Sequence, residues 1–502
     1  MIDTMKGGRL KDSITIESSI AEASGQGGAV AGTHRSDEAR LIPAASRELS
    51  GRLAGLSLPR QVFVLSIWPL LEQFMGFLVG TVDLAIAGRL EPQSFAVSAM
   101  DALGAATFVS WLMVLIHSAS GVGAASLIAR AIGGRRRGLA NAAVGQVIAM
   151  AAISGAIVMA AIFVAAGRFG ALCGLHGQSL ELCTLYLRVM ALGSPATAVL
   201  LVSCAALRAA GDTRSACGVM IIVNLANVIL SVLFVFGPAP IGGHGVAGIA
   251  WGTTLAWVIG TLLILAVLRG EGGVIRLRNA RLRPHWHTMR RIIKVALPNL
   301  FETACGIWLA SFLILVIVGR LADSAVLGAH VIVIRVESVA FLFGFAMAMA
   351  AATLTGQYLG LGDPVRARRA VLLCWGASVV FMGLMGVLFI TIPGALVSVL
   401  TSAPPLVDLA PMPIRICGFM QIPLATQIVL GSALRGAGDT RTTMWITILS
   451  TLLVRVPAAY VAAIVFDLGL NGVWIATSAE MMLRACILSA RFFGGGWMKV
   501  KV

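Results

Sequence analysis

Long apolar runs, separated by short stretches rich in charge, glycine or proline, recur between Arg60 and Arg491. Each run is close to the ~20 residues that an α-helix needs to cross the hydrocarbon core of a bilayer. The pattern predicts an all-α polytopic membrane protein with twelve transmembrane helices. We expect these helices near residues 60–87, 95–129, 139–167, 184–207, 215–237, 245–268, 294–319, 325–355, 368–393, 409–434, 442–465 and 471–491.

Composition agrees with a protein whose solvent is the lipid bilayer. Of the 502 residues, 58% are hydrophobic and 12% are charged, against roughly 45–50% and about 25% in soluble globular proteins. A net charge of +16 would suggest nucleic acid as the partner of a soluble chain. Here the basic residues lie in short loops between apolar runs, so we predict no nucleic-acid partner and assign the charge to orientation in the membrane.

The basic residues are distributed unequally between the two sets of loops. If the first helix crosses outward, the opposite side holds only Arg89, Arg168 and Arg320, with Arg188 and Arg415 at helix mouths. By the positive-inside rule, both termini are cytoplasmic, and we expect a multi-pass protein of the cytoplasmic (plasma) membrane. The loops on the starting side hold Arg130, Arg135, Arg136, Arg137, Arg208, Arg214, the dense stretch 269–294, Arg366, Arg368, Arg369, Arg435, Arg441, Lys499 and Lys501.

Two short motifs occur twice. The segment Leu-Arg-Ala-Ala-Gly-Asp-Thr-Arg at 207–214 returns 227 residues later as Leu-Arg-Gly-Ala-Gly-Asp-Thr-Arg at 434–441. The segment Ala-Gly-Arg-Leu at 87–90 returns 231 residues later as Val-Gly-Arg-Leu at 318–321. The chain is therefore an internal repeat of two six-helix units. Because six is even, we expect the copies to be related by a pseudo-twofold axis along the membrane normal.

The repeat divides the chain into five parts. We predict a disordered cytoplasmic tail at 1–58, a first six-helix lobe at 59–268, a basic cytoplasmic linker at 269–293, a second lobe at 294–492 and a cytoplasmic tail at 493–502. Two facing bundles that enclose a central cleft are typical of transporters that work by alternating access.

Several motifs resemble the multidrug and toxic compound extrusion (MATE) transporters. They are the two Leu-Arg-x-x-Gly-Asp-Thr-Arg loops, Gly-Gln-Tyr-Leu-Gly-Leu-Gly at 356–362, Arg-Val-Glu-Ser at 335–338, Val-Arg-Val-Pro at 454–457 and Gly-Val-Trp at 472–474. The resemblance covers nearly everything from residue 60 to 492. It implies efflux of bulky, often cationic organic compounds, driven by inward flow of protons or sodium ions.

Candidate cation-coupling groups in the first lobe are Asp83, Asn227, Ser231 and Thr253. An acid inside a membrane helix is costly and suggests function, and helix geometry places these four groups at one depth. A carboxylate among neutral oxygens could bind a proton or a sodium ion. The resemblance implies a site of this kind at Asp83, Asn227 and Thr253, but Ser231 replaces a second acid, which favours protons over sodium. Alternatively, Asp83 only caps hydrogen bonds between helices.

The second lobe offers Glu302, Glu337 and Arg455. An unpaired guanidinium in the middle of a membrane is expensive, and we expect Glu337 to be the partner of Arg455. We also expect Glu480 and Arg484, four residues apart on one helix, to form an ion pair. The resemblance allows a coupling acid at Glu302, one turn after Pro298, and Glu72 occupies a similar place in the first lobe. Both could instead belong to a cytoplasmic gate.

The repeated loops contain Arg208, Gly211 and Asp212 in the first lobe and Arg435, Gly438 and Asp439 in the second. Neither loop follows a strand or has a P-loop lysine, which argues against phosphate binding. We expect tight cytoplasmic turns, in which glycine supplies backbone freedom and aspartate caps the next helix.

These observations predict a secondary transporter that exchanges a hydrophobic, cationic organic compound for protons or sodium ions. We expect a monomer in the lipid bilayer, with no enzymatic activity, no cofactor and no metal other than a sodium ion at Asp83. A lipid-linked oligosaccharide or peptidoglycan-precursor flippase of the same superfamily is the first alternative. A polytopic membrane enzyme is the second, although the short outer loops and the absence of a metal-spaced cluster argue against it.

Overall fold

The computed structural model describes residues 48–49, 53–278, 285–321, 325–401 and 403–500, and these residues are helical with no β-strand among them. The predicted tail at 1–58 lies largely outside the described residues. Where the description resumes, Leu49 and Leu53 are buried and helix α3 begins at Leu58.

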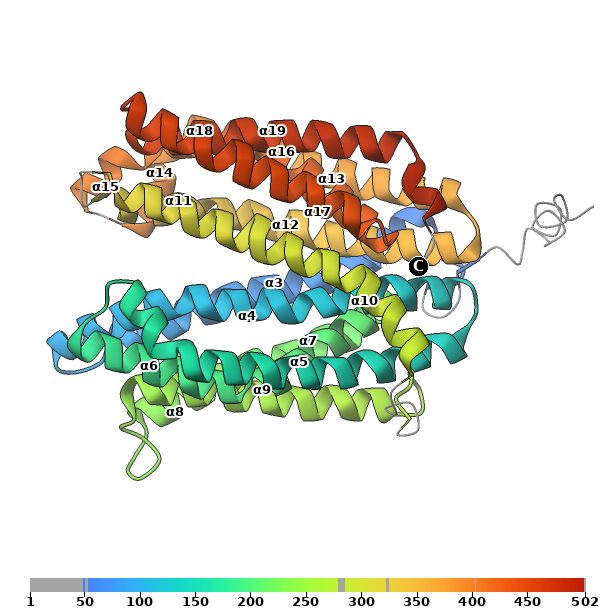
Figure 1. The fold of residues 1–502 in the computed structure, drawn as a ribbon, viewed down its shortest axis with the longest axis horizontal. Helices are drawn as coiled ribbons and strands as arrows, with labels where there is room; N and C mark the ends of the chain where they lie inside the picture. The colour runs from blue at the N-terminus through green and yellow to red at the C-terminus, as the bar shows by residue number, and fades with distance from the viewer. Residues whose placement is uncertain (1–47, 50–52, 279–284, 322–324, 402, 501–502) are drawn as a thin grey trace, which may run out of the picture. The chain divides into compact units, whose positions relative to one another are not determined.

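The first half of the chain forms seven helices that run back and forth along one direction (Figure 1). They are α3 (Leu58–Ala87), α4 (Gln93–Gly133), α5 (Arg137–Leu172), α6 (Gly177–Leu192), α7 (Ser194–Ala209), α8 (Thr213–Phe236) and α9 (Gly245–Arg269).

The second half repeats this path with more interruptions. Its elements are α10 (Trp286–Phe301), the π-helical segment η5 (Glu302–Leu309), α11 (Ala310–Gly319), α12 (Ala325–Leu361), α13 (Pro364–Thr391), α14 (Pro393–Leu400), α15 (Pro404–Leu409), α16 (Pro411–Gly436), α17 (Thr440–Ile448), η6 (Leu449–Arg455), α18 (Val456–Tyr460), η7 (Val461–Val465), α19 (Gly469–Phe493) and the 3₁₀-helix η8 (Gly496–Lys499).

Eleven of the described helices are long and apolar enough to cross a membrane, and α6 and α7 together make a twelfth span. The fourth span was predicted as one helix over 184–207. It begins earlier, at Gly177, and bends by 54° between α6 and α7. The bend falls where Gly193 is followed by Ser194 and Pro195. Proline lacks a backbone N–H, and it interrupts the helix ladder at this point.

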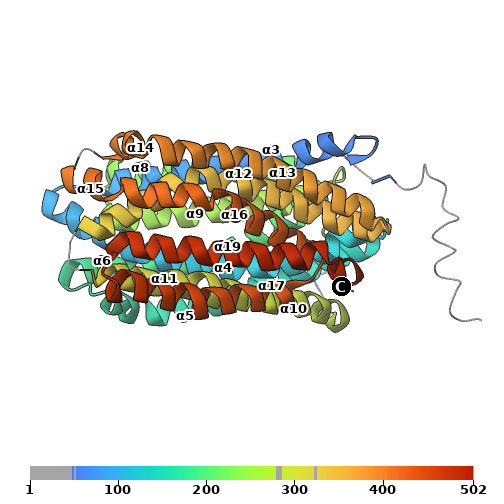
Figure 2. The same cartoon turned by 90° about the horizontal axis from the view of Figure 1, so that it is seen from above.

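The twelve spans form two lobes, as the internal repeat predicted. In Figure 1 the helices of the first half occupy one side of the bundle and those of the second half the other, and Figure 2 shows the same helices from above. One buried apolar cluster joins α4, α5, α7, α8 and α9, and another joins α11, α12, α16 and α19. Helix α10 departs from a strict division, because it packs against α4 and α5 as well as α17.

Two boundaries differ from the sequence prediction. Helix α9 ends at Arg269 and α10 begins at Trp286, so the second lobe starts earlier than residue 294 and the linker is shorter than 269–293. At the other end of the chain, the predicted tail includes a folded turn. The indole of Trp497 is buried, stacks on Phe492 with ring centroids 5.2 Å apart, and donates a 2.8 Å hydrogen bond to the Phe492 carbonyl.

We call one end of the lobes the basic end. It carries the turns after α4, α7, α12 and α16 and lies beside the label C in Figure 1. The other is the opposite end.

Candidate functional site

Three of the four first-lobe candidates lie together on α8 and α9. The Asn227 amide donates a 2.8 Å hydrogen bond to the hydroxyl of Thr253, which itself donates to the Ile249 carbonyl at 3.1 Å. Ser231 lies one helical turn further along α8, and its Oγ lies against Gly252, the residue before Thr253. Both Asn227 Oδ1 and Ser231 Oγ are buried and have no hydrogen-bond partner among the described residues. The site therefore presents two unused oxygen atoms.

Asp83 lies on α3, which packs against both α8 and α9. Its Oδ1 atom is buried and accepts no hydrogen bond from the described residues. The structure therefore gives no support to the alternative in which this oxygen caps an interhelical hydrogen bond. A buried carboxylate without donors is more stable when protonated or when a cation neutralises it. No distance from Asp83 to the Asn227–Thr253 pair is short enough to be a direct hydrogen bond.

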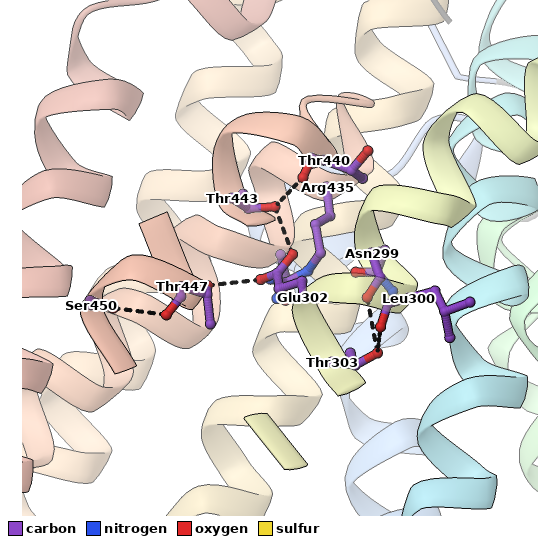
Figure 3. Close-up of polar contacts among 10 residues, drawn as sticks. Asn299, Leu300, Glu302, Thr303, Arg435, Thr440, Thr443, Thr447 and Ser450 are labelled. Carbon is purple, nitrogen blue, oxygen red and sulfur yellow. Dashed lines mark hydrogen bonds and ion pairs between the residues drawn. The ribbon is translucent and has the colours of Figure 1, made fainter. Parts of the chain in front are cut away.

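Glu302 of the second lobe is held by three hydrogen bonds (Figure 3). Only 2% of the residue is exposed, and it lies at the start of η5, one turn after Pro298. Its carboxylate accepts hydrogen bonds from Arg435 at 2.9 Å, Thr443 at 2.8 Å and Thr447 at 3.0 Å. This buried acid thus has one charged partner and two hydroxyl donors.

The predicted pairing of Arg455 with Glu337 is wrong. Arg455 donates from Nε to Glu480 of α19 at 2.9 Å, and its Nη2 forms an ion pair with the same oxygen. Glu337 is within electrostatic range of Arg455 but forms no hydrogen bond or ion pair with the described residues. Arg484 lies 3.2 Å from the other oxygen of Glu480, which confirms the predicted ion pair on α19. One fully buried carboxylate thus faces two arginines.

The two acids that follow a membrane-helix proline have equivalent partners in the two lobes. Arg208 of α7 donates to Glu72 of α3 at 3.0 and 3.1 Å, as Arg435 of α16 donates to Glu302. The glutamates are 230 residues apart and the arginines 227, close to the spacing of the repeated motifs. This pairing was not predicted, although the repeat itself contained the signal.

The repeated turns have the expected backbone geometry. Gly211 and Gly438 have φ values of +90° and +88°, which glycine adopts without steric cost. Asp212 caps α8 by accepting from the Ser215 N–H at 3.1 Å. Asp439 does not cap α17 in this way. Its carboxylate accepts instead from the Thr442 hydroxyl at 2.6 Å and from Arg491 of α19 at 2.9 Å.

The lobes are bonded to one another at the basic end. Arg130 of α4 donates to the carbonyls of Ala437 and Val500, each at 2.7 Å. Gln357 of α12 donates to the Ala209 carbonyl at 2.9 Å, and the hydroxyl of Tyr358 donates to Gln61 of α3 at 2.6 Å. These bonds join the first lobe to the second, so the basic end is closed.

The model of the MatE family matches two segments of this chain, residues 70–233 and 300–461. One match lies in each lobe. The chain belongs to the MATE family. Its fold and its two lobes are those of this transporter family, so it is a multi-pass membrane transporter and not an enzyme.

Known proteins resemble the chain over most of its length. A probable multidrug resistance protein NorM from Thermotoga maritima is 28% identical over 432 residues, which cover 85% of this chain and 90% of that protein. An outward-facing multidrug resistance MATE transporter of the MOP superfamily superposes with a TM-score of 0.81 at 20% identity, covering 89% of this chain and 98% of that one. A MOP superfamily transporter from Pyrococcus furiosus has the same TM-score and identity, with 91% and 99% coverage.

Proposed function

We propose that this MATE transporter exports hydrophobic, cationic organic compounds in exchange for protons. Five curated relatives that are probable multidrug resistance proteins, including that of Thermotoga maritima, support the substrate class. The observation that carries the coupling is the buried Asp83 Oδ1, which accepts no hydrogen bond from the described residues and belongs to a helix packed against the α8–α9 pair with its two unused oxygens.

The choice of protons over sodium follows from the charge of the ligand set. Asp83 is the acid among the first-lobe candidates, and Asn227, Ser231 and Thr253 add only neutral oxygens. A proton needs one carboxylate, whereas sodium is held by several hard oxygens and gains from additional negative charge. One carboxylate with few neutral ligands therefore favours protonation.

Coupling requires that protonation changes the relative stability of two states. The basic end is closed by backbone and side-chain hydrogen bonds across the lobes, including both bonds of Arg130. We take this to be the state open to the opposite end, with the basic end facing the cytoplasm and both termini on that side. Neutralising Asp83 removes a buried charge from α3, which packs against α8 and α9, and so changes how these helices pack.

The second-lobe acids have a structural role in this proposal. Glu302 and Glu480 each form ion pairs with arginines, and neutralising either acid would leave an arginine without its buried counter-charge. Glu337, inside the membrane-crossing helix α12, accepts no hydrogen bond from the described residues, and it is the second candidate for coupling.

The test is transport in liposomes that contain the purified protein and a fluorescent lipophilic cation. A proton gradient or a sodium gradient is imposed on the wild type, on Asp83→Asn and on the control Asp101→Asn. Asp101 is an exposed acid on the neighbouring helix α4. We expect transport with the proton gradient alone, lost in Asp83→Asn and kept in the control. Transport that survives Asp83→Asn would contradict the assignment, and no transport of any cation under either gradient would favour the flippase.

A further inference from the structure

A cavity of about 270 Å³ opens at the basic end, away from the candidate coupling residues. Three of its lining residues are arginines: Arg130 of α4, Arg136 in the turn before α5 and Arg291 of α10. Its other lining residues are leucine, alanine or glycine, and none is acidic. A hollow with three guanidinium groups and no lining carboxylate is electrostatically suited to an anion.

Arg130, which lines the cavity, has one N–H donor without an acceptor among the described residues. Its two terminal nitrogens are occupied by the Val500 and Ala437 carbonyls, at 2.7 Å each. Its Nε is buried and has no acceptor among the described residues. A buried cationic donor without an acceptor is costly, and an anion in the cavity that Arg130 lines would satisfy it.

The start of α5 adds to the positive potential. Leu139, in the first turn of α5, lines the cavity together with Arg136, the residue that precedes the helix. No side chain caps this N-terminus, and because the Leu139 N–H already bonds the Arg136 carbonyl at 3.0 Å, only the N–H groups of the helix before Leu139 lack a capping acceptor. Such groups and the helix dipole favour a negative charge.

We propose that this cavity binds a phosphate group, carried by the headgroup of an acidic phospholipid or present as free phosphate. One guanidinium group can bind two phosphate oxygens at once through two N–H donors. Basic pockets between membrane helices on the cytoplasmic side are suited to acidic lipid headgroups. The leucines of the lining, Leu127 and Leu139, give a lipid glycerol an apolar neighbour.

The site has a mechanical consequence. Arg130 and Arg136 belong to the first lobe, whereas Gly360 of α12 and Arg291 of α10 belong to the second. A bound phosphate would therefore contact both lobes and stabilise the closed basic end. This consequence rests on the proposed alternating access, but the binding itself does not.

Binding is measured without any transport assay, so that a failure here is distinct from a failure of the proposed function. Purified protein in neutral detergent is supplied with phosphatidylglycerol or with phosphatidylcholine of the same acyl chains, and retained lipid is counted by native mass spectrometry. The variants are Arg136→Gln and Arg291→Gln. The matched control is Arg137→Gln, an exposed arginine next to Arg136 that does not line the cavity.

We expect the wild type and Arg137→Gln to retain phosphatidylglycerol in preference to phosphatidylcholine, and both test variants to bind it about tenfold more weakly. A parallel titration with inorganic phosphate at constant ionic strength shows whether the ligand is the lipid headgroup or free phosphate. The unfolding temperature is measured at each phosphate concentration. Stabilisation by phosphate without lipid preference, lost in Arg136→Gln, would support the site with the free anion as ligand. Equal retention in all four proteins with no effect of phosphate would overturn the proposal.

Discussion

At the scale of single residues, five acids inside the membrane helices fall into two groups. Glu72, Glu302 and Glu480 are paired with arginines from other helices. Asp83 and Glu337 have no such partner among the described residues. Paired acids stabilise the packing of the helices they join. Unpaired acids can change their charge at a lower cost in free energy, because no arginine loses its counter-charge.

The pairing of Glu302 leads to a stability prediction. Glu302→Gln leaves the Arg435 charge without its counter-ion, and we expect the free energy of unfolding to fall by roughly 2–4 kcal/mol. The double variant Glu302→Gln with Arg435→Gln should recover part of that loss, because no charge is then left unpaired. Unfolding in detergent measures both. The control is Glu181→Gln, an exposed acid expected to change stability by less than about 0.5 kcal/mol.

The pairing would be contradicted if the double variant lost more free energy of unfolding than the two single variants lose together.

The sequence was sufficient to find most of these residues but not their partners. Asp83, Glu302 and Arg455 stand out because a charge in an apolar run is rare. The partner of Arg455 depends on which helix lies beside η6, and that helix is α19, which carries Glu480. Helix adjacency is a property of the tertiary structure, and a charge count along the chain does not contain it. The offset between the repeats would have indicated the equivalence of the Glu72 and Glu302 pairs.

At the scale of elements, glycines allow helices of the two lobes to touch at the basic end. Gly133 of α4 faces the Gln357 backbone of α12, and Gly360 of α12 faces the Arg130 carbonyl of α4. A Cβ atom at either glycine would overlap a backbone atom of the other lobe. Small residues are what permits membrane helices to approach so closely.

This contact gives a prediction for Gly360→Ala. The added methyl group would clash with the Arg130 backbone of the other lobe. We therefore expect the basic end to open more often. Spin labels on Arg137 and Val365, both exposed at the basic end and in different lobes, report the separation in a cysteine-free background. We expect longer distances in Gly360→Ala than in the control Gly376→Ala, where a Cβ meets nothing within 4 Å.

Identical distance distributions in the two variants would show that this contact does not hold the basic end closed.

Element positions followed from hydrophobic periodicity, whereas breaks within elements did not. Eleven predicted spans correspond to continuous or nearly continuous helices. The bend at Gly193 and the π-helical segments η5, η6 and η7 were not predicted, because nearly every residue in these runs is apolar and an interrupted helix has the same composition as a straight one. Prolines such as Pro298 were the available signal, since a missing N–H disturbs the helix ladder nearby.

At the scale of the whole molecule, the internal repeat predicted two lobes, and the family match to each lobe confirms that organisation. The repeat could not predict which end is closed. Closure depends on single hydrogen bonds such as those of Arg130 and on backbone contacts at glycines, which are not periodic in the sequence. The proposed cycle combines a gate at the basic end with a titrating acid in the first lobe.

The most direct test of this account is to measure proton movement driven by substrate. Liposomes containing the protein and an internal pH dye, with no ion gradient imposed, receive a lipophilic cation on one side. With the wild type and Asp101→Asn, we predict that protons move in the direction opposite to the cation and change the internal pH. With Asp83→Asn, we predict no change of internal pH. Cation uptake without a pH change in the wild type, or an equal pH change in Asp83→Asn, would contradict proton exchange through Asp83.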